Sequence, residues 1–339
     1  MRKNAERFLT IIIVLFIAVG CTKEIPENTD KYSGLKGAYL GQAEPDTSAQ
    51  IFASGIVSTG LNERDATFSP DGNEFYFSIW QSSKGTIVCM KQVNGKWTNP
   101  KVVSFSGIYN DLEPFITNDG QKLFFASNRP TEGTEPIDYN IWVAERTSDS
   151  GWGQPVMLDS AINSEANEFY PTLTENGDLY FTSSNKKALG SEDIFVSKFV
   201  NGAYQEYENL GDSVNSPRDE FNSFIANDGS YLIYGTTGFG NGFGNGDLWV
   251  CFKKDDGSWS RPKNLGGNIN SNKLDYCPSI TKDGKFMFFT STKVAERNYD
   301  KRTSYEQLVK DYNNPNNGAG DIYWVSAEVI QKLKSEMKN

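Results

Sequence analysis

The chain has 339 residues, with 43 acidic and 33 basic side chains, a formal net charge of −10 at pH 7 and no histidine. An acidic surface repels phosphate backbones, so we do not expect nucleic acid to be a partner. The missing histidine excludes Ser-His-Asp and Cys-His nucleophiles and His-ligated zinc sites, and it leaves open chemistry that needs carboxylates alone.

The first 20 residues have the layout of a secretory signal peptide. The basic stretch "MRKNAER" is followed by residues 8–19, which carry no charge, and then by Gly20 and Cys21. This order of a positive segment, an apolar segment and a small residue is typical of export signals. The apolar run is shorter than the ~20 residues of a membrane-spanning helix, which disfavours an N-terminal anchor helix. We therefore predict a signal peptide over residues 1–20.

The segment "AVGC" (18–21) resembles the lipobox of bacterial lipoproteins. The resemblance implies that Cys21 becomes the lipidated first residue of the mature chain and holds the protein to a membrane. Thr22, in place of Asp, implies the outer membrane of the cell envelope, with the protein facing either the periplasm or the cell surface. Residues 21–44 are polar and contain Pro and Gly, which predicts a flexible tether.

Five copies of one pattern follow, each centred on an Asp-Gly or Asn-Gly dipeptide between two apolar runs. They begin "RDATFSPDGNEFYFS", "LEPFITNDGQKLFFAS", "FYPTLTENGDLYFTSS", "FNSFIANDGSYLIYGT" and "YCPSITKDGKFMFFTS". The dipeptides predict type I′ hairpins. Three consecutive apolar residues after each turn predict strands that are covered on both faces, as in stacked propeller blades. A third and a fourth strand-like run complete each unit at a period of roughly 50 residues.

The fifth copy ends after its third strand, at "DIYWVSAEV", whereas an unassigned strand-like run occupies residues 49–58. We expect this N-terminal run to complete the last blade, because ring closure removes exposed sheet edges. The prediction is an all-β, five-bladed β-propeller of four-stranded antiparallel blades over residues 45–326. A short C-terminal helical tail is expected over residues 327–339.

The "FSPDG…YFS…DIYV" repeats resemble the TolB-like, WD-type β-propeller repeat, and the resemblance covers residues 45–326. It implies a lipoprotein of the bacterial envelope. TolB has six blades and an extra N-terminal α/β domain, whereas this chain shows five copies. The resemblance therefore does not imply a TolB role in envelope constriction.

The two ends of the propeller differ in the length of the connections between strands. The tight turns share one end, and the long connections over residues 128–139, 184–192, 235–246 and 292–320 share the other. Function concentrates on long loops carried by a rigid scaffold, so we take the loop-rich end as the candidate ligand face. The candidate contact residues on it are Arg129, Phe239, Phe243, Arg297, Tyr299, Arg302 and Tyr305.

Two of these loops have distinct compositions. The stretch "TTGFGNGFGNGD" lacks the following helix and the Gly-Lys-Ser/Thr of a phosphate loop, so we interpret it as a glycine loop that displays two aromatic rings. In the last loop, Ser304 and Gln307 predict a capped short helix. This insert is either a solvated loop over the channel or a lid or partner-contact element.

One acid recurs eight residues before the turn Asp or Asn in every copy, at Glu63, Asp111, Glu168, Glu220 and Asp275. Because it precedes the innermost strand, we expect an acidic ring near the channel mouth. Such carboxylates repel one another unless a cation or internal donors compensate them. The ring therefore predicts either a structural Ca²⁺ site or a local structural role in each loop, and we expect no other cofactor.

Three cysteines besides Cys21, namely Cys89, Cys251 and Cys277, lie in apolar strand-like runs. An odd number prevents complete pairing, and we predict buried free thiols.

Two functional hypotheses from different classes remain, beside a purely structural scaffold, which predicts a smooth face with no cleft. The first is a non-catalytic envelope lipoprotein whose loop-rich face binds a protein partner or a glycan. The second is a carboxylate-dependent glycoside hydrolase that uses acids near the channel mouth, since such enzymes need one acid and one base or nucleophile. A deep pocket with two acids and stacking aromatics favours the enzyme, and a shallow polar face favours the binder.

Overall fold

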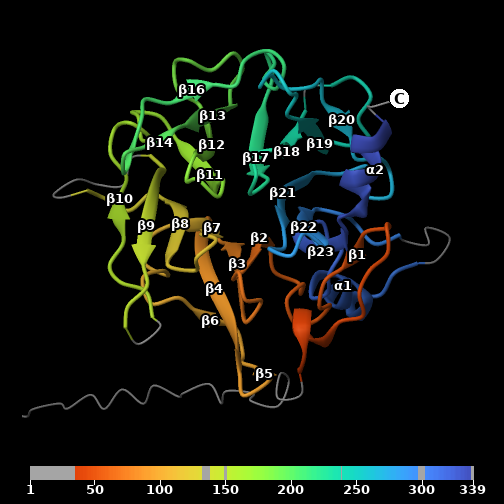
Figure 1. Ribbon diagram of the computed structural model, residues 1–339. Helices are drawn as coiled ribbons and strands as arrows, with labels where there is room; N and C mark the ends of the chain where they lie inside the picture. The colour runs from red at the N-terminus through yellow and green to blue at the C-terminus, as the bar shows by residue number, and fades with distance from the viewer. Residues whose placement is uncertain (1–34, 132–137, 149–150, 238, 297–301, 337–339) are drawn as a thin grey trace, which may run out of the picture.

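The computed structural model describes residues 35–131, 138–148, 151–237, 239–296 and 302–336. Five four-stranded antiparallel sheets are arranged as blades around a central axis (Figure 1). The innermost strands are β2, β7, β11, β17 and β21, and the chain enters each blade from the axis (Figure 1). The predicted five-bladed propeller is confirmed.

The first three blades follow the repeat in chain order. Blade 1 contains β2 (Glu63–Phe68), β3 (Glu74–Gln81), β4 (Lys84–Val93) and β6 (Lys101–Val102), with β5 (Lys96–Trp97) extending the β4 hairpin. Blade 2 contains β7 (Asp111–Ile116), β8 (Lys122–Ser127), β9 (Asn140–Glu145) and β10 (Val156–Met157). Blade 3 contains β11 (Glu168–Leu173), β12 (Leu179–Ser183), β13 (Asp193–Ser197) and β16 (Glu208–Asn209). A separate hairpin pairs β14 (Phe199–Val200) with β15 (Ala203–Tyr204).

The last two blades complete the ring. Blade 4 contains β17 (Glu220–Ile225), β18 (Tyr231–Thr236), β19 (Asp247–Phe252) and β20 (Lys263–Asn264). Blade 5 contains β21 (Asp275–Ile280), β22 (Phe286–Ser291), β23 (Asp321–Ser326) and the N-terminal β1 (Gln50–Ile51).

The N-terminal strand closes the last blade, as predicted. Strand β1 pairs antiparallel with β23 and places Gln50 opposite Trp324. It is much shorter than the predicted run 49–58, because the chain then turns under blade 5. There the Ser58 hydroxyl donates to the Ile322 carbonyl at 3.0 Å and accepts the Ile322 N–H at 3.0 Å.

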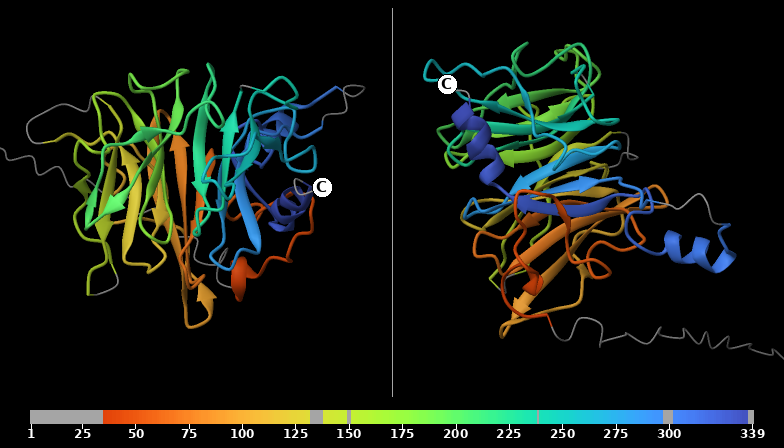
Figure 2. Two further views of the ribbon diagram at one scale, coloured as in Figure 1. Left: turned by 45° about the horizontal axis from the view of Figure 1, so that its top comes forward. Right: turned by 90° about the vertical axis from the view of Figure 1, so that its right-hand side faces the viewer.

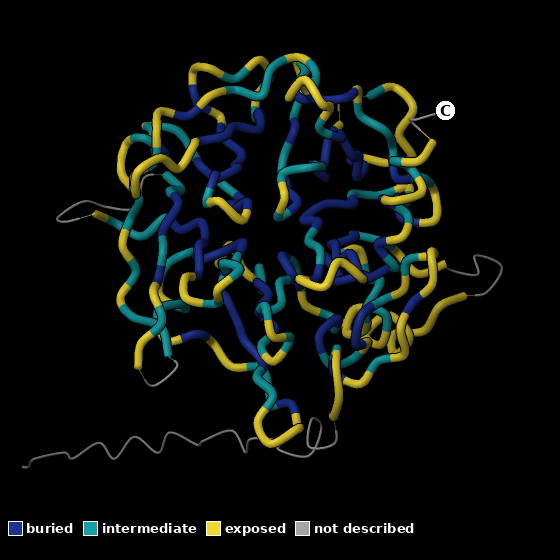
Figure 3. The backbone as a smooth tube through the Cα atoms, viewed as in Figure 1, coloured by how far each residue is buried: buried dark blue, intermediate teal, exposed yellow. Residues whose placement is uncertain are grey.

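The core consists of apolar layers between neighbouring blades. Phe75 and Phe77 belong to the layer between blades 5 and 1, whereas Tyr76 belongs to the layer between blades 1 and 2. Figure 3 shows that the strands are mostly buried and that exposed chain is concentrated in the connections. The continuous apolar runs therefore mark strands that bury both faces, as predicted.

The Asp-Gly turns differ from the predicted type I′ geometry. The Ser69 carbonyl accepts the Gly72 N–H at 2.9 Å, and Gly72 has a φ of 69° whereas Asp71 does not have a positive φ. The loop therefore spans four residues with only the glycine in the left-handed region, as in longer hairpins built on a type I turn. Positive φ at both central residues occurs instead in the second hairpin of blade 1, at Asn94 and Gly95.

Two α-helices lie outside the blades (Figure 2). Helix α1 (Tyr305–Tyr312) has no buried residue and stands away from the sheets (Figure 2), and its N-cap Ser304 accepts the Gln307 N–H as predicted. Helix α2 (Glu328–Glu336) forms the predicted C-terminal helix and buries Ile330 against the layer between blades 4 and 5.

The segment that precedes β1 is fixed to the turn end of the propeller. The 3-10 helix η1 (Ala38–Gly41) places the Tyr39 ring 5.0 Å from that of Phe286. The Trp97 indole N–H donates to the Gly37 carbonyl at 2.8 Å. The described chain therefore begins at the end opposite to the loop-rich face.

Ring closure predicts a large cost for Phe52→Ala. Phe52 is fully buried next to β1, with its ring 5.0 Å from Phe288 and 5.2 Å from Trp324. We expect the free energy of unfolding to fall by about 3–5 kcal/mol, measured by urea denaturation. The matched control Phe243→Ala removes a ring that is 52% exposed and should change it by less than about 1 kcal/mol. Equal effects would contradict this account of closure.

Candidate functional site

The five ring acids lie at the first position of the innermost strands, and each is at least 99% buried. In four blades the carboxylate accepts the hydroxyl and the backbone N–H of the residue four positions earlier. In blade 4, for example, the Ser216 hydroxyl and the Ser216 backbone N–H each donate to the Glu220 carboxylate at 2.7 Å. The same pairs are Thr59 with Glu63, Ser164 with Glu168, and Ser271 with Asp275.

Blade 2 departs from this pattern because Gly107 stands where the hydroxyl residue would be. Arg129 replaces the missing donor, with its Nη2 atom 2.6 Å from Asp111 Oδ1. The guanidinium also lies over the rings of Phe125, at 5.0 Å, and Trp142, at 5.2 Å. Arg129 therefore supports its own blade with a side chain that is only 10% exposed.

These contacts support a structural role for the ring acids, because protein donors already compensate the carboxylates. Among the residues that the structure describes, no group of three or more Asp, Glu or Cys side chains could hold a metal ion. A structural Ca²⁺ at the ring stays a prediction. A melting-temperature rise with millimolar Ca²⁺ is the observation that would support it, since a ligand at 100 times its Kd adds ~2.7 kcal/mol.

A different set of residues lies on the axis itself. The residue two positions after each ring acid has a positive φ, and each inner strand has a register shift there. These bulge residues are Asp65, Glu113, Tyr170, Asn222 and Cys277. Bulges re-aim side chains and are frequent beside functional sites. Sequence reasoning missed this ring, although its signal is visible: the position differs in every copy while the flanking pattern repeats.

Glu113 is the centre of a network that joins the bulge residues across the axis. It accepts Arg64 Nη2 at 2.8 Å, Asn222 Nδ2 at 3.0 Å and the Tyr170 N–H at 2.7 Å. Arg64 also pairs with Asp65 at 2.8 Å. Burial raises the pKa of Glu113 to about 8, against the opposing effect of the Arg64 charge. When Glu113 is protonated, Asp65 is therefore the one carboxylate in this network that balances the charge of the Arg64 guanidinium.

A cavity of about 870 Å³ opens above this network at the loop-rich end. Its aromatic lining residues are Trp80, Tyr139, Phe169, Phe221 and Tyr276. Its charged lining residues are Arg64, Glu113, Glu192 and Asp219, and Asn62, Asn167 and Asn222 add amides. The candidate site is therefore concave and is built from all five blades.

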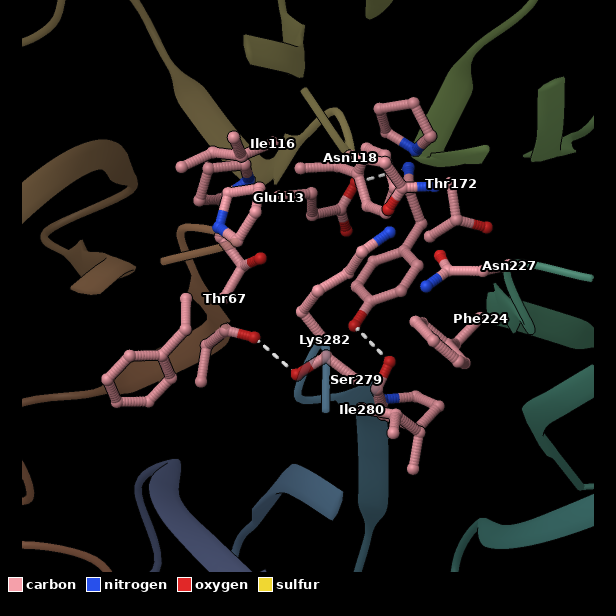
Figure 4. Close-up of a pocket in the computed structure, with 18 residues that line it drawn as sticks. Thr67, Glu113, Ile116, Asn118, Thr172, Phe224, Asn227, Ser279, Ile280 and Lys282 are labelled. Atoms are coloured by element: carbon pink, nitrogen blue, oxygen red, sulfur yellow. Dashed lines mark hydrogen bonds between the residues drawn. The ribbon is translucent and has the colours of Figure 1, made fainter. Parts of the chain in front are cut away.

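A second and much smaller pocket, of about 40 Å³, lies at the turn end of the axis (Figure 4). Glu113 lines both cavities, and the side chain of Lys282 reaches across the smaller one (Figure 4). The Glu113 network thus separates the two ends of the channel, and the larger cavity is accessible from the loop-rich face.

Glu192 and Asp219 both line the large cavity, and the Asp219 charge acts on the Glu192 carboxyl. Burial and the neighbouring Asp219 charge raise the pKa of Glu192, and Arg64 opposes this shift. Among the described residues, no donor reaches either carboxylate, and Asp219 Oδ1 is buried. Asp111, Asp275 and Asp321 also have one unpartnered oxygen, but each has a donor on its other oxygen.

The predicted contact residues occupy several environments. Phe239 packs against Trp249 with ring centroids 4.8 Å apart, whereas Phe243 is 52% exposed. Arg302 and Tyr305 are exposed on the α1 insert, and none of the described residues of this insert lines the large cavity. Arg297, Tyr299 and Cys21 lie outside the described residues.

The prediction of buried free thiols is confirmed for Cys89, Cys251 and Cys277. Burial raises the pKa of Cys89 and of Cys251 to about 12, so neither is a reactive thiolate at neutral pH.

Comparisons with known proteins give distant structural likenesses. No protein-family model and no curated sequence matches the chain. TolB from Acinetobacter baumannii is 14% identical with a TM-score of 0.45 over 79% of this chain, which spans 57% of that protein. A putative TolB from Agrobacterium tumefaciens is 13% identical with a TM-score of 0.46, over 78% of this chain and 90% of that one. The GH43 endo-arabinanase from Bacillus licheniformis is 10% identical with a TM-score of 0.47, over 78% and 94%. At these values no function follows from any of the three.

Within the described part of the chain, no helix has the length and apolar character needed to cross a membrane.

Stability should fall between pH 5 and pH 8. Burial raises the pKa of Glu63 and of Asp321 to about 7, and it also raises the pKa values of Glu168, Glu220 and Asp275. Because the folded pKa exceeds the unfolded one, the stability that these protonated carboxyls contribute is complete below the unfolded pKa, 4.5 for Glu63 and 3.8 for Asp321. It is lost as pH rises through about 7. Glu63 alone represents on the order of 3 kcal/mol.

Thermal melts across this range test the effect. Glu63→Gln should flatten the fall, whereas the exposed control Glu175→Gln should leave it unchanged. An unaltered slope in Glu63→Gln would refute the assignment.

Arg129→Met should destabilise the protein by about 3–5 kcal/mol, because it removes the positive charge paired with the buried Asp111 and leaves only the Ser127 hydroxyl as a side-chain donor to it. The control Lys187→Met breaks an exposed pair with Glu206 and should cost at most about 1 kcal/mol. Urea denaturation of both variants gives the comparison. A small effect of Arg129→Met would show that the ion pair is dispensable.

Proposed function

We propose that this protein is an envelope lipoprotein that binds a carbohydrate in the channel-mouth cavity of its loop-rich face. The observation that supports it best is the cavity of about 870 Å³, lined by five aromatic rings and by amide, hydroxyl and carboxylate groups. Ligand sites are typically concave and largely apolar, with a few polar groups that fix orientation. Aromatic rings offer flat apolar surfaces, and the polar groups match the hydroxyls of a sugar.

A small ligand suits this cavity better than a protein partner. A stable protein interface covers about 800 Å² on each side and is broad, whereas this site is a pit on the axis of the propeller. The exposed apolar residues of α1 are outside the cavity lining. A glycan chain could enter the pit with one or two sugar units while the remainder stays in solvent.

The proposed membrane attachment rests on the Cys21 motif. Residues 35–41 are bound at the turn end, next to Asp283 and Trp97. A lipid anchor upstream of them would therefore join the propeller at the end opposite to the cavity. Cys21→Ser should move the protein from the membrane fraction to the soluble fraction if Cys21 carries the anchor.

Glycoside hydrolysis is a second candidate, favoured by the Glu192–Asp219 pair. Glycosidases use two carboxyl groups, one with a raised pKa as general acid and one as base or nucleophile. Glu192, with its raised pKa, would be the acid and Asp219 its partner. Release of new reducing ends from a bound glycan, lost in Glu192→Gln while binding persists, would establish this activity.

Binding is tested with a glycan array followed by calorimetry on the glycans that bind. Trp80→Ala should weaken binding at least about fivefold, since an aromatic anchor typically contributes more than 1 kcal/mol. The matched control Trp259→Phe alters an indole remote from the cavity and should leave affinity unchanged. Binding that survives Trp80→Ala and Phe169→Ala unchanged would place the ligand elsewhere.

A further inference from the structure

The residue immediately before the ring acid has a repeated role in three blades. Asn62, Asn110 and Asn167 occupy this position, and each amide oxygen accepts a backbone N–H from the preceding blade. The donors are Gly320 at 3.1 Å, Gly85 at 3.0 Å and Tyr139 at 3.0 Å. This contact joins neighbouring blades at the channel mouth and explains why asparagine recurs at this position in three blades.

Between blades 3 and 4 the same place holds two acids. Asp219 replaces the asparagine, and Glu192 occupies the position of Tyr139. The Glu220 N–H donates to the Glu192 carbonyl at 2.9 Å, as the Glu168 N–H donates to the Tyr139 carbonyl at 2.8 Å. The inter-blade amide contact is absent here, because no donor reaches Asp219 among the described residues. Both Asp219 and Glu192 therefore differ from the residues at the equivalent positions between blades 2 and 3.

This departure has a cost, and among the described residues no hydrogen-bond donor to the two carboxylates offsets it. Like charges in a partly buried site repel, and Arg64, the one basic residue of the described lining, opposes this from a distance, since its guanidinium contacts Asp65 and Glu113 and donates to neither acid of the pair. The ring acids, in contrast, all have hydroxyl or guanidinium donors. A ligand that brings a positive charge would remove the repulsion.

The cavity around the pair suits an organic cation better than a bare metal ion. Five aromatic rings line it, and ring faces attract ammonium groups. Calcium takes six to eight oxygen ligands, whereas no third acidic group joins the pair in the described chain.

We propose that Glu192 and Asp219 bind the ammonium group of an amino sugar, so that the cavity selects glycans containing unacetylated, glucosamine-type units. This inference rests on the proposed carbohydrate binding. Each carboxylate accepts one ammonium N–H, and the aromatic lining covers the sugar ring.

Calorimetry with chemically matched ligands tests the selection. Glucosamine and its β-1,4 trimer are compared with N-acetylglucosamine and its trimer, which carry a neutral acetamide in place of the ammonium group on each sugar, and with Nα-acetyl-lysine methylamide, an ammonium without a sugar. We expect the amine form to bind at least about tenfold more tightly than the acetylated form, since one charge-assisted hydrogen bond gives a difference of this order. Glu192→Gln and Asp219→Asn should each reduce the ratio to about one, and Asp255→Asn, on an exposed turn, should preserve it.

Stability separates a binding role from a structural one. Asp219→Asn restores the residue found in blades 1–3, so its melting temperature should equal or exceed that of the unaltered protein. If both Asp219→Asn and Glu192→Gln lose selectivity and also melt at a lower temperature, the pair is structural. If Glu192→Gln loses selectivity while remaining as stable as the parent, the pair has a binding role.

The outcomes also separate this inference from the proposed function. Binding of neutral glycans with no preference for amines would overturn the amino-sugar inference and leave carbohydrate binding intact. Equal binding of Nα-acetyl-lysine methylamide would overturn it in favour of a peptide amine. Failure of every glycan on the array would overturn both.

Discussion

Pairing of β1 with β23 is the constraint on which the architecture depends. Each blade buries both of its faces against its neighbours. The first and last blades must therefore cover each other, and β1 completes the last blade where they meet. Phe52 fills the layer between them, beside Phe75 on one side and Phe288 and Trp324 on the other. The residues at the channel mouth come from all five blades, so their arrangement also depends on this closure.

The axis of the propeller contains polar groups because the inner strands bulge there. A positive φ at the third residue of each inner strand is uncommon for non-glycine side chains and costs conformational energy. The bulges bring Asp65, Glu113 and Asn222 into one network with Arg64. This network lies between the two cavities of the axis and contributes Arg64, Glu113 and Asn222 to the lining of the larger one.

Repeated and exceptional residues have different meanings in this protein. The acids that recur in every blade, such as Glu220 with Ser216, hold their own loops and are satisfied by local donors. Where one partner is missing, as at Gly107, another residue, Arg129, replaces it. Asp219 and Glu192 break the repeat without any such replacement, which is why they, and not the ring acids, carry the functional proposal.

The sequence by itself determined the blade count, the order of strands within each blade, the closure by the N-terminal run and both short helices. These follow from local turn residues and apolar periodicity, which depend on neighbours in the chain and recur five times. The acidic ring was visible for the same reason, and so was its position at the start of the inner strands. Tertiary structure decided which side chains meet: it buried Arg129 against Asp111, joined Arg64 to Glu113, and brought Glu192 of one blade and Asp219 of the next into one cavity. Such contacts link residues from different blades, and their geometry depends on bulges and ring closure, which no single repeat contains.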